Sequence, residues 1–475
     1  MVFGFECVSS RRILCIATLT LMAFSAANIY AQKPLAVWMT TGDKTNLLKE
    51  QPPLRWKKAT ATDSAIVIDD AQTYQTMDGF GHALTGGTAE LMMKMSPSAR
   101  TSLLRELFGD GPNDIDTSYI RISVGASDMN DHVYTYDDLP VGETDPELKH
   151  FSLAEDEKNV IPVLREVVAI QPKIKILASP WTAPAWMKDN DKVKGGTLKK
   201  EFYGAYAHYW VLYLQGMQAY GIHIDALTIQ NEPENPKNTP SMVLSAQQEA
   251  DFIGGYLGPA LAAADLKTKI IGFDHNCDHP EYPETILRDP SAARYTDGSG
   301  FHLYLGQISA LTTVHDAFPQ KNIYFTEQMV VALPKATDFS IAEPVAKLII
   351  GAPENWSRNV LLWNLAADPH DGPHTSDGGC PMCSGAITLD GDHVTRLLAY
   401  YTAAQASKFV PPGSVRIGSE AGVDSLPHVA FRTPRKKHVL IVSNNTQTGS
   451  LVKIRFHQRQ AEMRLPANAV ATCIW

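Results

Sequence analysis

The sequence predicts an α/β protein in which a (β/α)8 TIM barrel carries an attached small all-β sandwich domain formed by the chain ends. Three observations support this prediction. Between about residues 78 and 400, short β-rich runs alternate with amphipathic stretches of helical period, the pattern of repeated βα units. After about residue 410, short alternating strands follow one another between turn residues. Two strand-like segments before residue 78 have no helix beside them.

The β-rich runs number eight, as a TIM barrel requires. They are Gly79–Leu84, Tyr119–Val124, Ile174–Ala178, Ala226–Ile229, Lys269–Phe273, Gly300–Leu303, Ile323–Phe325 and Val360–Trp363. The stretches between them have helix signals of their own. Ser152 and Glu155 have the spacing of a capping box ahead of apolar residues that repeat at helical spacing from Val160. A further helix is expected from about Phe202 to Tyr220.

The predicted sandwich combines both ends of the chain. Its C-terminal strands include residues 428–432, 438–443 and 451–456, and the segments Ala36–Thr40 and Ser64–Asp69 are expected to join the same sheet. The predicted domains are therefore a signal peptide at 1–31, N-terminal sandwich strands at 32–77, the barrel at 78–409 and the rest of the sandwich at 410–475.

The N-terminus has the features of a signal peptide. Arg11 and Arg12 precede an apolar run from Ile13 to Ala27, with small residues at Ser25-Ala26-Ala27 and at Ala31. The run is too short for an ordinary membrane-spanning helix, and no later stretch reaches that length, so no stable membrane insertion is expected. The sequence predicts export, either periplasmic or secreted, after removal of this peptide.

The bulk composition narrows the class of protein further. Hydrophobic residues make up 44% of the chain and charged residues 20%, enough apolar material for a large domain and a smaller one. The net charge of -9 lacks the basic excess that steers proteins to phosphate backbones, so nucleic acid is not an expected partner. The oligomeric state is left open.

Four cysteines remain after the predicted signal peptide. Cys380 and Cys383 lie in a Gly-rich stretch, and in an oxidising compartment a local disulfide is the preferred interpretation. A zinc site normally needs four ligands in recognisable pairs, and only His374 is near this pair. No metal is predicted here.

Polar residues follow all eight β-rich runs. In TIM barrels the chemistry gathers at the carboxyl ends of the strands, so these residues are candidates for an active site. In strand order they are His82, Asp128, Trp181, Asn231 with Glu232, Asp274 with His275, His302 with Tyr304, Glu327, and Trp363 with Asn364. A single such residue is most often structural, but eight together favour function.

Two glutamates directly follow apolar strands. Pro233 keeps Glu232 out of helical geometry, and Glu327 ends a strand three units later. They lie 95 residues apart, or about 32 per unit, near the roughly 30 of a compact barrel. Glycoside hydrolysis needs one carboxylic acid and one carboxylate, and this pair supplies both. Glu232 is expected to be the acid/base with a raised pKa, and Glu327 an ionised nucleophile.

The neighbouring residues suit a sugar, whose apolar C–H faces stack on aromatic rings while its hydroxyls need directional partners. Trp181 and Trp363 are the candidate platforms. The candidate polar contacts are Asp128, Asn231, His302 and Tyr304. The run Asp274–His279 has metal-ligand residue types, but its adjacent spacing favours a loop lining the cleft over a metal site. Neither a metal nor an organic cofactor is predicted.

The motifs resemble glycoside hydrolase family 30, to which the glucosylceramidases belong. Thr228-Ile-Gln-Asn-Glu-Pro-Glu234 is similar to the acid/base motif and Tyr324-Phe-Thr-Glu-Gln328 to the nucleophile motif. Further similar segments are Asp78–Gly81, Tyr134–Asp138, Ala178–Lys188, Gly300–Tyr304 and Trp363–Ala366. The resemblance covers almost the whole mature chain. It implies retaining chemistry, a barrel with an attached sandwich, and sugar contacts by Asp128, Trp181, Asn231, His302, Tyr304 and Trp363.

Two departures bear on the substrate. His82-Ala-Leu-Thr-Gly-Gly87 lacks the aspartate that follows the threonine in the animal lysosomal enzymes, and the loop Gly372–Gly385 resembles microbial members similar to β-1,6-glucanases. The main prediction is a retaining hydrolase of β-D-glucosidic bonds, of glucosylceramidase or β-glucosidase type. The first alternative is an endo-β-1,6-glucanase, so a β-glucoside, glucan or glycolipid is the expected partner. The remaining alternatives are a non-catalytic carbohydrate-binding barrel and a metal-dependent hydrolase using Asp274, His275 and His302.

Overall fold

A computed structural model describes residues 34–59, 65–330, 339–421 and 426–475. The predicted signal peptide at residues 1–31 lies outside the described residues. Among the helices that are described, none combines the length and the apolar character needed to cross a membrane.

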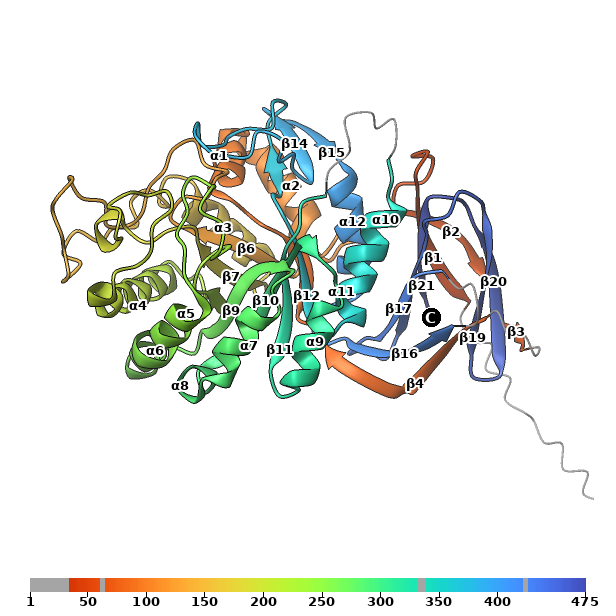
Figure 1. Cartoon of the computed structure of the whole chain (residues 1–475). Coiled ribbons are helices and arrows are strands. Elements are labelled where there is room, and N and C mark those ends of the chain that lie inside the picture. The colour runs from red at the N-terminus through yellow and green to blue at the C-terminus, as the bar shows by residue number, and fades with distance from the viewer. Residues whose placement is uncertain (1–33, 60–64, 331–338, 422–425) are drawn as a thin grey trace, which may run out of the picture. The chain divides into compact units, whose positions relative to one another are not determined.

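Eight parallel strands form the predicted barrel (Figure 1). Their hydrogen-bonded order is β5-β12-β11-β10-β9-β8-β7-β6, and a parallel bridge between Ala83 and Arg121 connects the first strand to the last. All eight predicted runs are confirmed: β5 (Gly79–His82), β6 (Tyr119–Val124), β7 (Lys175–Pro180), β8 (Ala226–Thr228), β9 (Lys269–Cys277), β10 (Thr296–Gly306), β11 (Asn322–Glu327) and β12 (Ser357–Leu362). Most of their residues are buried, because helices cover the outside and side chains fill the inside.

Helices follow the barrel strands in chain order. They are α1 (Gly86–Lys94), α2 (Pro97–Phe108), α3 (Val160–Ile170), α4 (Tyr203–Ala219), α5 (Ala246–Phe252), α6 (Gly258–Ala263), α7 (Glu281–Arg288), α8 (Pro290–Ala293), α9 (Ala310–Ala317), α10 (Ala342–Pro344), α11 (Gly351–Glu354) and α12 (Leu398–Ser407). Short 3-10 turns are η1 (Ala185–Met187) and η2 (Lys200–Phe202), and π-helical turns η3 (Ile253–Leu257) and η4 (Val345–Ile350) connect α5 to α6 and α10 to α11. The expected helix near residues 202–220 is α4.

The capping box expected at Ser152 and Glu155 is wrong. The Ser152 hydroxyl accepts a hydrogen bond from the backbone of Ala154 at 3.2 Å, and Glu155 pairs with Lys158. Helix α3 begins only at Val160, where Asn159 precedes it without a side-chain cap. Residues 154–159 form turns ahead of the helix, so the helix begins later than the cap signal suggested.

Strand β9 is longer than the sequence predicted. It continues to Cys277, so Asp274, His275 and Asn276 are in the strand and not in a loop. Phe273 and Asp274 have φ of 76° and 64°, and the pairing register with β10 shifts at this point. Such an irregularity re-aims side chains, which is how consecutive polar residues enter the barrel.

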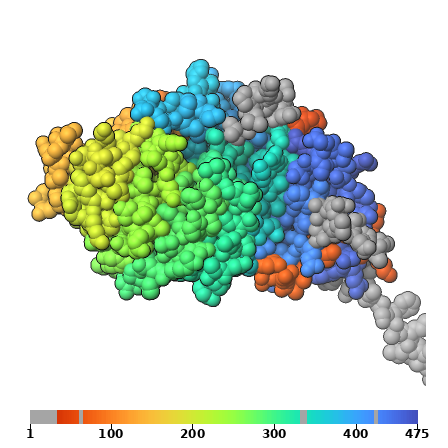
Figure 2. Space-filling view, in the orientation of Figure 1, coloured from red at the N-terminus to blue at the C-terminus, as the bar shows by residue number. Residues whose placement is uncertain are grey.

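The sandwich contains strands from both chain ends, as predicted. Its strand order is β2-β1-β21-β18-β17-β16-β4-β19-β20-β3. The N-terminal strands are β1 (Leu35–Thr41), β2 (Lys49–Leu54), β3 (Lys57–Lys58) and β4 (Ala65–Thr76). The C-terminal strands are β16 (Val415–Ala421), β17 (His428–Arg432), β18 (His438–Asn444), β19 (Ser450–Phe456), β20 (Arg459–Leu465) and β21 (Ala469–Ile474). Figure 2 shows N-terminal segments, in orange, against the blue C-terminal strands.

The sandwich has its own core and packs on the barrel. Inward residues such as Leu35, Ile454 and Val442 form a separate apolar cluster. At the junction, the Thr472 hydroxyl donates to the Gln405 carbonyl at 2.9 Å, and the Ser443 hydroxyl donates to the Ala342 carbonyl at 2.6 Å. Helix α12, which contains Gln405, thus connects the last sandwich strand to the barrel.

A small third sheet lies beyond the last barrel strand. It consists of β13 (Ala366–Ala367), β14 (Ile387–Asp390) and β15 (His393–Arg396), in that order. The loop from Gly372 to Gly385 connects β13 to β14, so this sheet holds both ends of the loop.

Candidate active site

The two glutamates predicted from the sequence lie at the same end of the barrel. Glu232 is four residues beyond β8, and Glu327 is the last residue of β11. Glu232 has a φ of 48°, outside helical geometry as expected before Pro233, and its backbone N–H donates to the Asp274 carbonyl at 3.0 Å. The two residues are only 7% and 6% exposed, so both carboxylates are largely withdrawn from water.

His302, on β10 next to β11, brings the two carboxylates together. Its Nδ1 lies 3.3 Å from Glu232 Oε1 and 3.9 Å from Glu327 Oε1. These oxygens can therefore be no further apart than the sum of both distances, about 7 Å. Paired carboxylates of retaining glycosidases lie about 5–5.5 Å apart, and those of inverting enzymes about 6.5–9.5 Å. The upper limit of about 7 Å is compatible with the retaining spacing.

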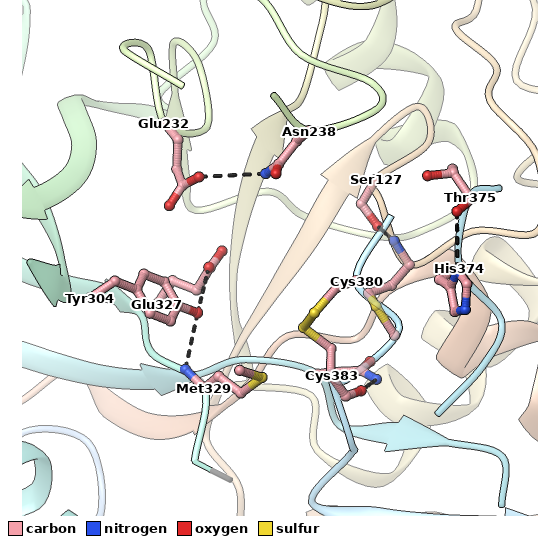
Figure 3. Close-up of a disulfide and its surroundings, with 12 residues drawn as sticks. Ser127, Glu232, Asn238, Tyr304, Glu327, Met329, His374, Thr375, Cys380 and Cys383 are labelled. Atoms are coloured by element: carbon pink, nitrogen blue, oxygen red, sulfur yellow. Dashed lines mark hydrogen bonds between the residues drawn. A yellow bond between two sulfur atoms is a disulfide. The ribbon is translucent and has the colours of Figure 1, made fainter. Parts of the chain in front are cut away.

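Glu232 has amide donors beside it. Its Oε2 accepts a hydrogen bond from Asn235 Nδ2 at 2.7 Å. The same oxygen accepts one from Asn238 Nδ2 at 3.4 Å (Figure 3). His275 Nδ1 lies 3.8 Å from the other oxygen, Oε1. Neither asparagine was predicted from the sequence, although both follow Glu232 within six residues in the same loop.

Glu327 is held by two donors. The guanidinium of Arg121 donates from Nη1 to Oε2, and the Tyr304 hydroxyl donates to Oε1 at 2.9 Å. The Tyr304 oxygen in turn accepts from the Met329 backbone at 3.1 Å (Figure 3). Both contacts leave the Glu327 carboxylate as an acceptor, which is the form that attacks an electrophile.

Arg121 is a central residue that sequence reasoning missed. It is fully buried on β6, and besides Glu327 it donates to Asn231 Oδ1 at 2.7 Å, Asp274 Oδ2 at 2.8 Å and Ser179 Oγ at 3.1 Å. The sequence did contain a signal for this role, because an arginine inside a strand that is buried on both faces must be paired with acids.

Asp274, a strand-end candidate that the sequence analysis placed in a loop, lies inside β9. It is fully buried and accepts from His302 Nε2 at 3.0 Å and from the Thr326 hydroxyl at 2.6 Å. Burial raises its pKa, but the charge of Arg121 and the His302 contact outweigh burial and lower the pKa well below the usual range. Asp274 therefore stays ionised and orients both cations.

Each ring nitrogen of His302 faces a carboxylate oxygen, which favours the imidazolium. Burial alone would lower its pKa, but the charge of Glu327 and the bonds to Asp274 and Glu232 raise it to about 9. The pKa of Glu232 is raised by burial but lowered to about 2 overall, chiefly by His302. Burial raises the pKa of Glu327, against the charges of His302 and Arg121.

These directions are opposite to the ones expected from the sequence. The expectation considered only the two glutamates, whereas His302 lies between them, and its contacts raise its own pKa and lower that of Glu232. His302 Nδ1 and Glu232 Oε1 lie 3.3 Å apart, so the titrations of these two residues are coupled and belong to the pair rather than to either one.

The predicted sugar-contact residues surround these carboxylates. Trp181 and Trp363 pack 5.4 Å apart at their ring centroids and are only 2% and 5% exposed, so they offer little open face. Arg121 lies 5.0 Å from the centre of the Trp181 ring. Among the described residues, nothing bonds to Trp181 Nε1 or Asp128 Oδ1, although both atoms are buried. Burial and the charges of Glu327 and Glu232 raise the pKa of Asp128 to about 8.

Two residues of the strand-end set have structural roles. His82 Nε2 is bonded to the Ala399 carbonyl of α12 at 3.3 Å, and burial lowers the pKa of His82 to about 4. The Asn364 side-chain oxygen accepts from the hydroxyls of Thr85 and Thr88 at 3.0 Å. Neither residue is bonded to a glutamate of the site.

The loop from Gly372 to Gly385 lies beside the site. Cys380 and Cys383 form a disulfide (Figure 3). Cys383 packs with Trp181 and Trp363. The Thr375 backbone N–H donates to the Asp128 carbonyl at 3.0 Å, and its hydroxyl donates to the Thr239 carbonyl at 2.7 Å. The loop thereby connects the segments that carry Asp128 and Glu232.

Among the described residues at this end of the barrel, one group of side chains has the spacing to hold a metal ion. In the part of the chain that the structure describes, Glu232, His275 and His302 bring ligand atoms within 4.8 Å of one another. Both nitrogens of His302 already face carboxylates, and Asp274 is occupied by Arg121 and hydroxyl donors. The contacts of these side chains are therefore those of an ion-pair network and not those of a metal site.

A TIM barrel with two buried carboxylates at the carboxyl ends of its strands is typical of a glycoside hydrolase. The comparison of sequences identifies the family. The TIM-barrel domain of glycosyl hydrolase family 30 matches residues 77–409, and the β-sandwich domain of the same family matches residues 413–473. The chain belongs to glycosyl hydrolase family 30, and its substrates are β-glycosides.

Three relatives illustrate the range of similarity. An endo-1,6-β-D-glucanase of Neurospora crassa is 35% identical, with 84% of each chain covered. The lysosomal acid glucosylceramidase of Mus musculus is 30% identical, with 82% of this chain and 78% of the relative covered. The solved structure of an endo-β1,6-glucanase is 33% identical with a TM-score of 0.86, covering 93% of this chain and 99% of that one.

Proposed function

We propose that the chain is a retaining endo-β-1,6-glucanase in which Glu327 is the nucleophile and Glu232 the acid/base. The mechanism is supported chiefly by one observation, that both carboxylates lie close to His302 Nδ1. This nitrogen is 3.3 Å from Glu232 Oε1 and 3.9 Å from Glu327 Oε1. The finer substrate assignment is supported by the 1,6-glucanase relatives, which match with somewhat higher identity than the glucosylceramidase. These comparisons favour the alternative from the sequence over the main prediction of a glucosylceramidase or β-glucosidase.

The first half of the reaction forms a glycosyl-enzyme. A carboxylate oxygen of Glu327 bonds to the anomeric carbon while the bond from that carbon to the O6 oxygen of the next glucose breaks. Glu232 gives a proton to the departing oxygen, so the leaving group departs as a neutral alcohol. Arg121 and Tyr304 hold Glu327 in position by hydrogen bonds as it approaches the sugar.

The second half releases the sugar. Glu232, now ionised, removes a proton from water, the water oxygen bonds to the anomeric carbon, and the bond to Glu327 breaks. Two inversions give net retention of the β configuration. Glu232 ends protonated and Glu327 ionised, so the cycle closes without a cofactor.

The proton that Glu232 uses is stored on His302 in the free site. Because His302 Nδ1 and Glu232 Oε1 are hydrogen-bonded, the same contact accommodates the proton on either atom. Asp274 holds the other ring nitrogen at 3.0 Å, so His302 stays in place when the proton moves. This sharing supplies a protonated Glu232 to the leaving group although its pKa in the free site is low.

The predicted sugar contacts enter the proposal as binding residues. Asp128 and the Trp181 indole N–H have buried polar atoms that no described residue satisfies, and sugar hydroxyls are suitable partners. Asn231, fixed by Arg121, is placed beside Glu232 to contact the 2-hydroxyl, and Trp363 packs against Trp181.

A substrate panel with product analysis tests the proposal. The purified chain is incubated with short β-glucosides, β-1,6-glucan, glucosylceramide and xylan, and product lengths are measured over time. An endo-β-1,6-glucanase releases a mixture of short oligosaccharides from β-1,6-glucan, first as β anomers. The Glu327→Gln variant, which cannot attack, is the control for contaminating activity.

Other outcomes of the panel overturn parts of the proposal. Release of glucose alone indicates exo cleavage, and preferential turnover of glucosylceramide restores the main sequence prediction. Product appearing first as the α anomer contradicts the retaining mechanism. Tight glucan binding without cleavage supports the non-catalytic barrel.

We also propose that the chain is exported, because β-1,6-glucan is a polymer too large to enter a cell intact. The N-terminal signal features support this proposal. The mature N-terminus, determined by mass spectrometry, is expected just after Ala27 or Ala31. An intact N-terminus on the mature protein contradicts it.

A further inference from the structure

A group of metal-ligand side chains lies outside the catalytic residues, in the long loop between β6 and α3. Asp137, Asp145 and His150 each offer one ligand atom, and these atoms lie within 4.8 Å of one another. The three residues are too widely spaced in sequence to form a familiar motif, and folding of the loop brings them together.

Asp137 is the unusual member of the group. It is 1% exposed, yet neither of its carboxylate oxygens has a hydrogen-bond partner among the described residues. Buried carboxylates are almost always paired, since an unsatisfied buried charge is strongly unfavourable. The Asp137 backbone, in contrast, is well held, because its carbonyl accepts from Trp186 Nε1 at 3.0 Å. The Asp137 carboxylate therefore lies near the ligand atoms of Asp145 and His150, and no described residue hydrogen-bonds to either of its oxygens.

Asp145 and His150 form the other side of the group. Asp145 Oδ2 accepts from the His150 backbone and from His150 Nδ1, both at 2.8 Å. The Asp145 residue is buried, whereas the His150 side chain is 68% exposed. An ion can therefore reach the group from the solvent side, where it replaces the hydrogen bond between His150 Nδ1 and Asp145 Oδ2.

The surrounding loop is acidic. Asp131, Asp138, Glu143 and Glu147 are in the same segment, while Lys149 is occupied by Glu147. This excess of negative charge favours a cation over an anion at the group.

We propose that Asp137, Asp145 and His150 form a structural binding site for a divalent transition-metal ion such as Zn²⁺. Two carboxylates and one imidazole, with water in the remaining positions, suit Zn²⁺ better than Ca²⁺, because Ca²⁺ prefers oxygen ligands alone. The ion supplies the positive partner that the Asp137 carboxylate lacks. It joins residue 137 to residues 145–150 and so stabilises the loop whose first part carries Asp128.

The site is separate from the Glu232, His275 and His302 group, and a single variant distinguishes the two. Asp137→Asn removes the unpaired charge with little change of shape and leaves the other group intact. Asp131→Asn is the matched control, since it removes an exposed charge from the same loop without touching the site.

Binding is measured on the full chain after chelator treatment, by calorimetric titration with Zn²⁺ and separately with Ca²⁺ at pH 7.5. Burial and the charge of Asp145 raise the pKa of Asp137 to about 6, so the carboxylate is mostly ionised at this pH. We expect one more Zn²⁺ per chain, or at least about 10-fold tighter binding, in the wild type and Asp131→Asn than in Asp137→Asn. Ca²⁺ is expected to bind more weakly than Zn²⁺.

Thermal unfolding gives an independent readout. Without metal, Asp137→Asn should unfold at the same temperature as the wild type or higher, because it relieves a buried unpaired charge. With Zn²⁺, the wild-type unfolding temperature should rise with the logarithm of ion concentration, and that of Asp137→Asn should rise less. Equal Zn²⁺ binding and equal thermal shifts in the two proteins overturn the site. Tighter binding of Ca²⁺ overturns the assigned metal class.

Discussion

At the scale of single residues, the charges of the site converge on Arg121. Its guanidinium contacts Glu327, Asn231, Asp274 and Ser179, so one side chain fixes the nucleophile, the amide beside the acid/base and the central aspartate. A guanidinium makes these contacts through its rigid fork of five donors, whereas an ammonium has only three and no planar geometry.

Arg121→Lys is therefore expected to lower kcat/KM by about 100-fold, the size of effect that a misplaced reacting group produces. Arg358→Lys is the matched control, because Arg358 pairs with Asp78 at the beginning of β12, away from the glutamates. Kinetics on a chromogenic β-glucoside, with circular dichroism to confirm folding, measures the effect. A folded Arg121→Lys enzyme within a few-fold of wild type contradicts the role given to Arg121.

His302→Gln tests the shared proton. The pKa of His302 is raised to about 9, so the proton shared with Glu232 is present at neutral pH and is lost as the pH rises toward 9. Without the imidazolium, Glu232 alone must retain the proton, and the alkaline limb of the kcat/KM profile is expected at lower pH. His275→Gln is the control, since burial lowers the pKa of His275 and leaves it neutral. If the alkaline limb of the His302→Gln profile does not move, that limb belongs to another acid, such as Asp128.

The sequence could predict polar residues near the carboxyl ends of the apolar runs, but not Arg121 in the middle of one. Glu232 and Glu327 stand out because each ends an apolar run, and their spacing matches three barrel units. Arg121 and Asp274 face the barrel interior from within strands, and only the closed barrel brings these two together. The pKa directions failed for the same reason, since they depend on His302 lying between two carboxylates.

At the scale of elements, strand β9 is bent where it delivers Asp274. Phe273 and Asp274 have positive φ values of 76° and 64°, each of which costs about 1–3 kcal/mol for a residue other than glycine. Glu249 of α5 holds this bend, because its Oε1 accepts from the Phe273 backbone and its Oε2 from the Tyr282 hydroxyl, both at 2.9 Å.

Glu249→Ala is expected to destabilise the protein by about 1–3 kcal/mol, because it leaves the buried Phe273 N–H and the Tyr282 hydroxyl without this partner. It should also lower kcat through a displaced Asp274. Glu249→Gln keeps an acceptor for Phe273 and should remain closer to the wild type in both respects. Urea unfolding and steady-state kinetics measure the two effects. Equal stability of the alanine and glutamine variants argues against this role.

The strands were predictable as elements because a buried parallel strand is a short apolar run between turns, and this signal is local. The extent of β9 was not, since polar residues in a strand look like a loop until the positive φ values that re-aim them are known. The cap of α3 failed similarly, because Ser152 forms a bond within its own turn.

At the scale of the whole molecule, buried acids make stability depend on pH. Burial raises the pKa of Glu249 to about 7 and of Asp156 and Asp116 to about 6. The folded chain therefore binds more protons than the unfolded chain between about pH 4 and 7, and stability falls as the pH rises through that window. Below about pH 4, the lowered pKa values of Glu232 and Asp274 have the opposite effect, and stability falls as the pH decreases.

The unfolding temperature is thus expected to be highest near pH 5 and lower at pH 7. Differential scanning calorimetry in the presence of chelator measures this without a contribution from metal binding. Glu249→Gln, which cannot ionise, should show a weaker decline than the wild type. A wild-type unfolding temperature that rises steadily from pH 5 to 7 contradicts the assignment.

The discontinuous sandwich was predictable from the sequence because strand-like segments before the barrel had no helices to pair with. Its junction with the barrel was not, since it depends on individual polar contacts. Gln405 is fully buried in α12 and donates to the Thr40 hydroxyl at 2.6 Å, so strands from both chain ends contact one barrel helix.

The central claim is that Glu327 forms a covalent bond to the sugar while Glu232 serves as acid/base. The most direct measurement traps this intermediate with a 2-fluoro β-glucoside that has a good leaving group, followed by mass spectrometry of the intact protein and its peptides. The account predicts one fluorosugar per chain, attached to the peptide at Glu327, and no such adduct in Glu327→Gln. Attachment to any other residue, or steady turnover with inverted product and no adduct, would contradict it.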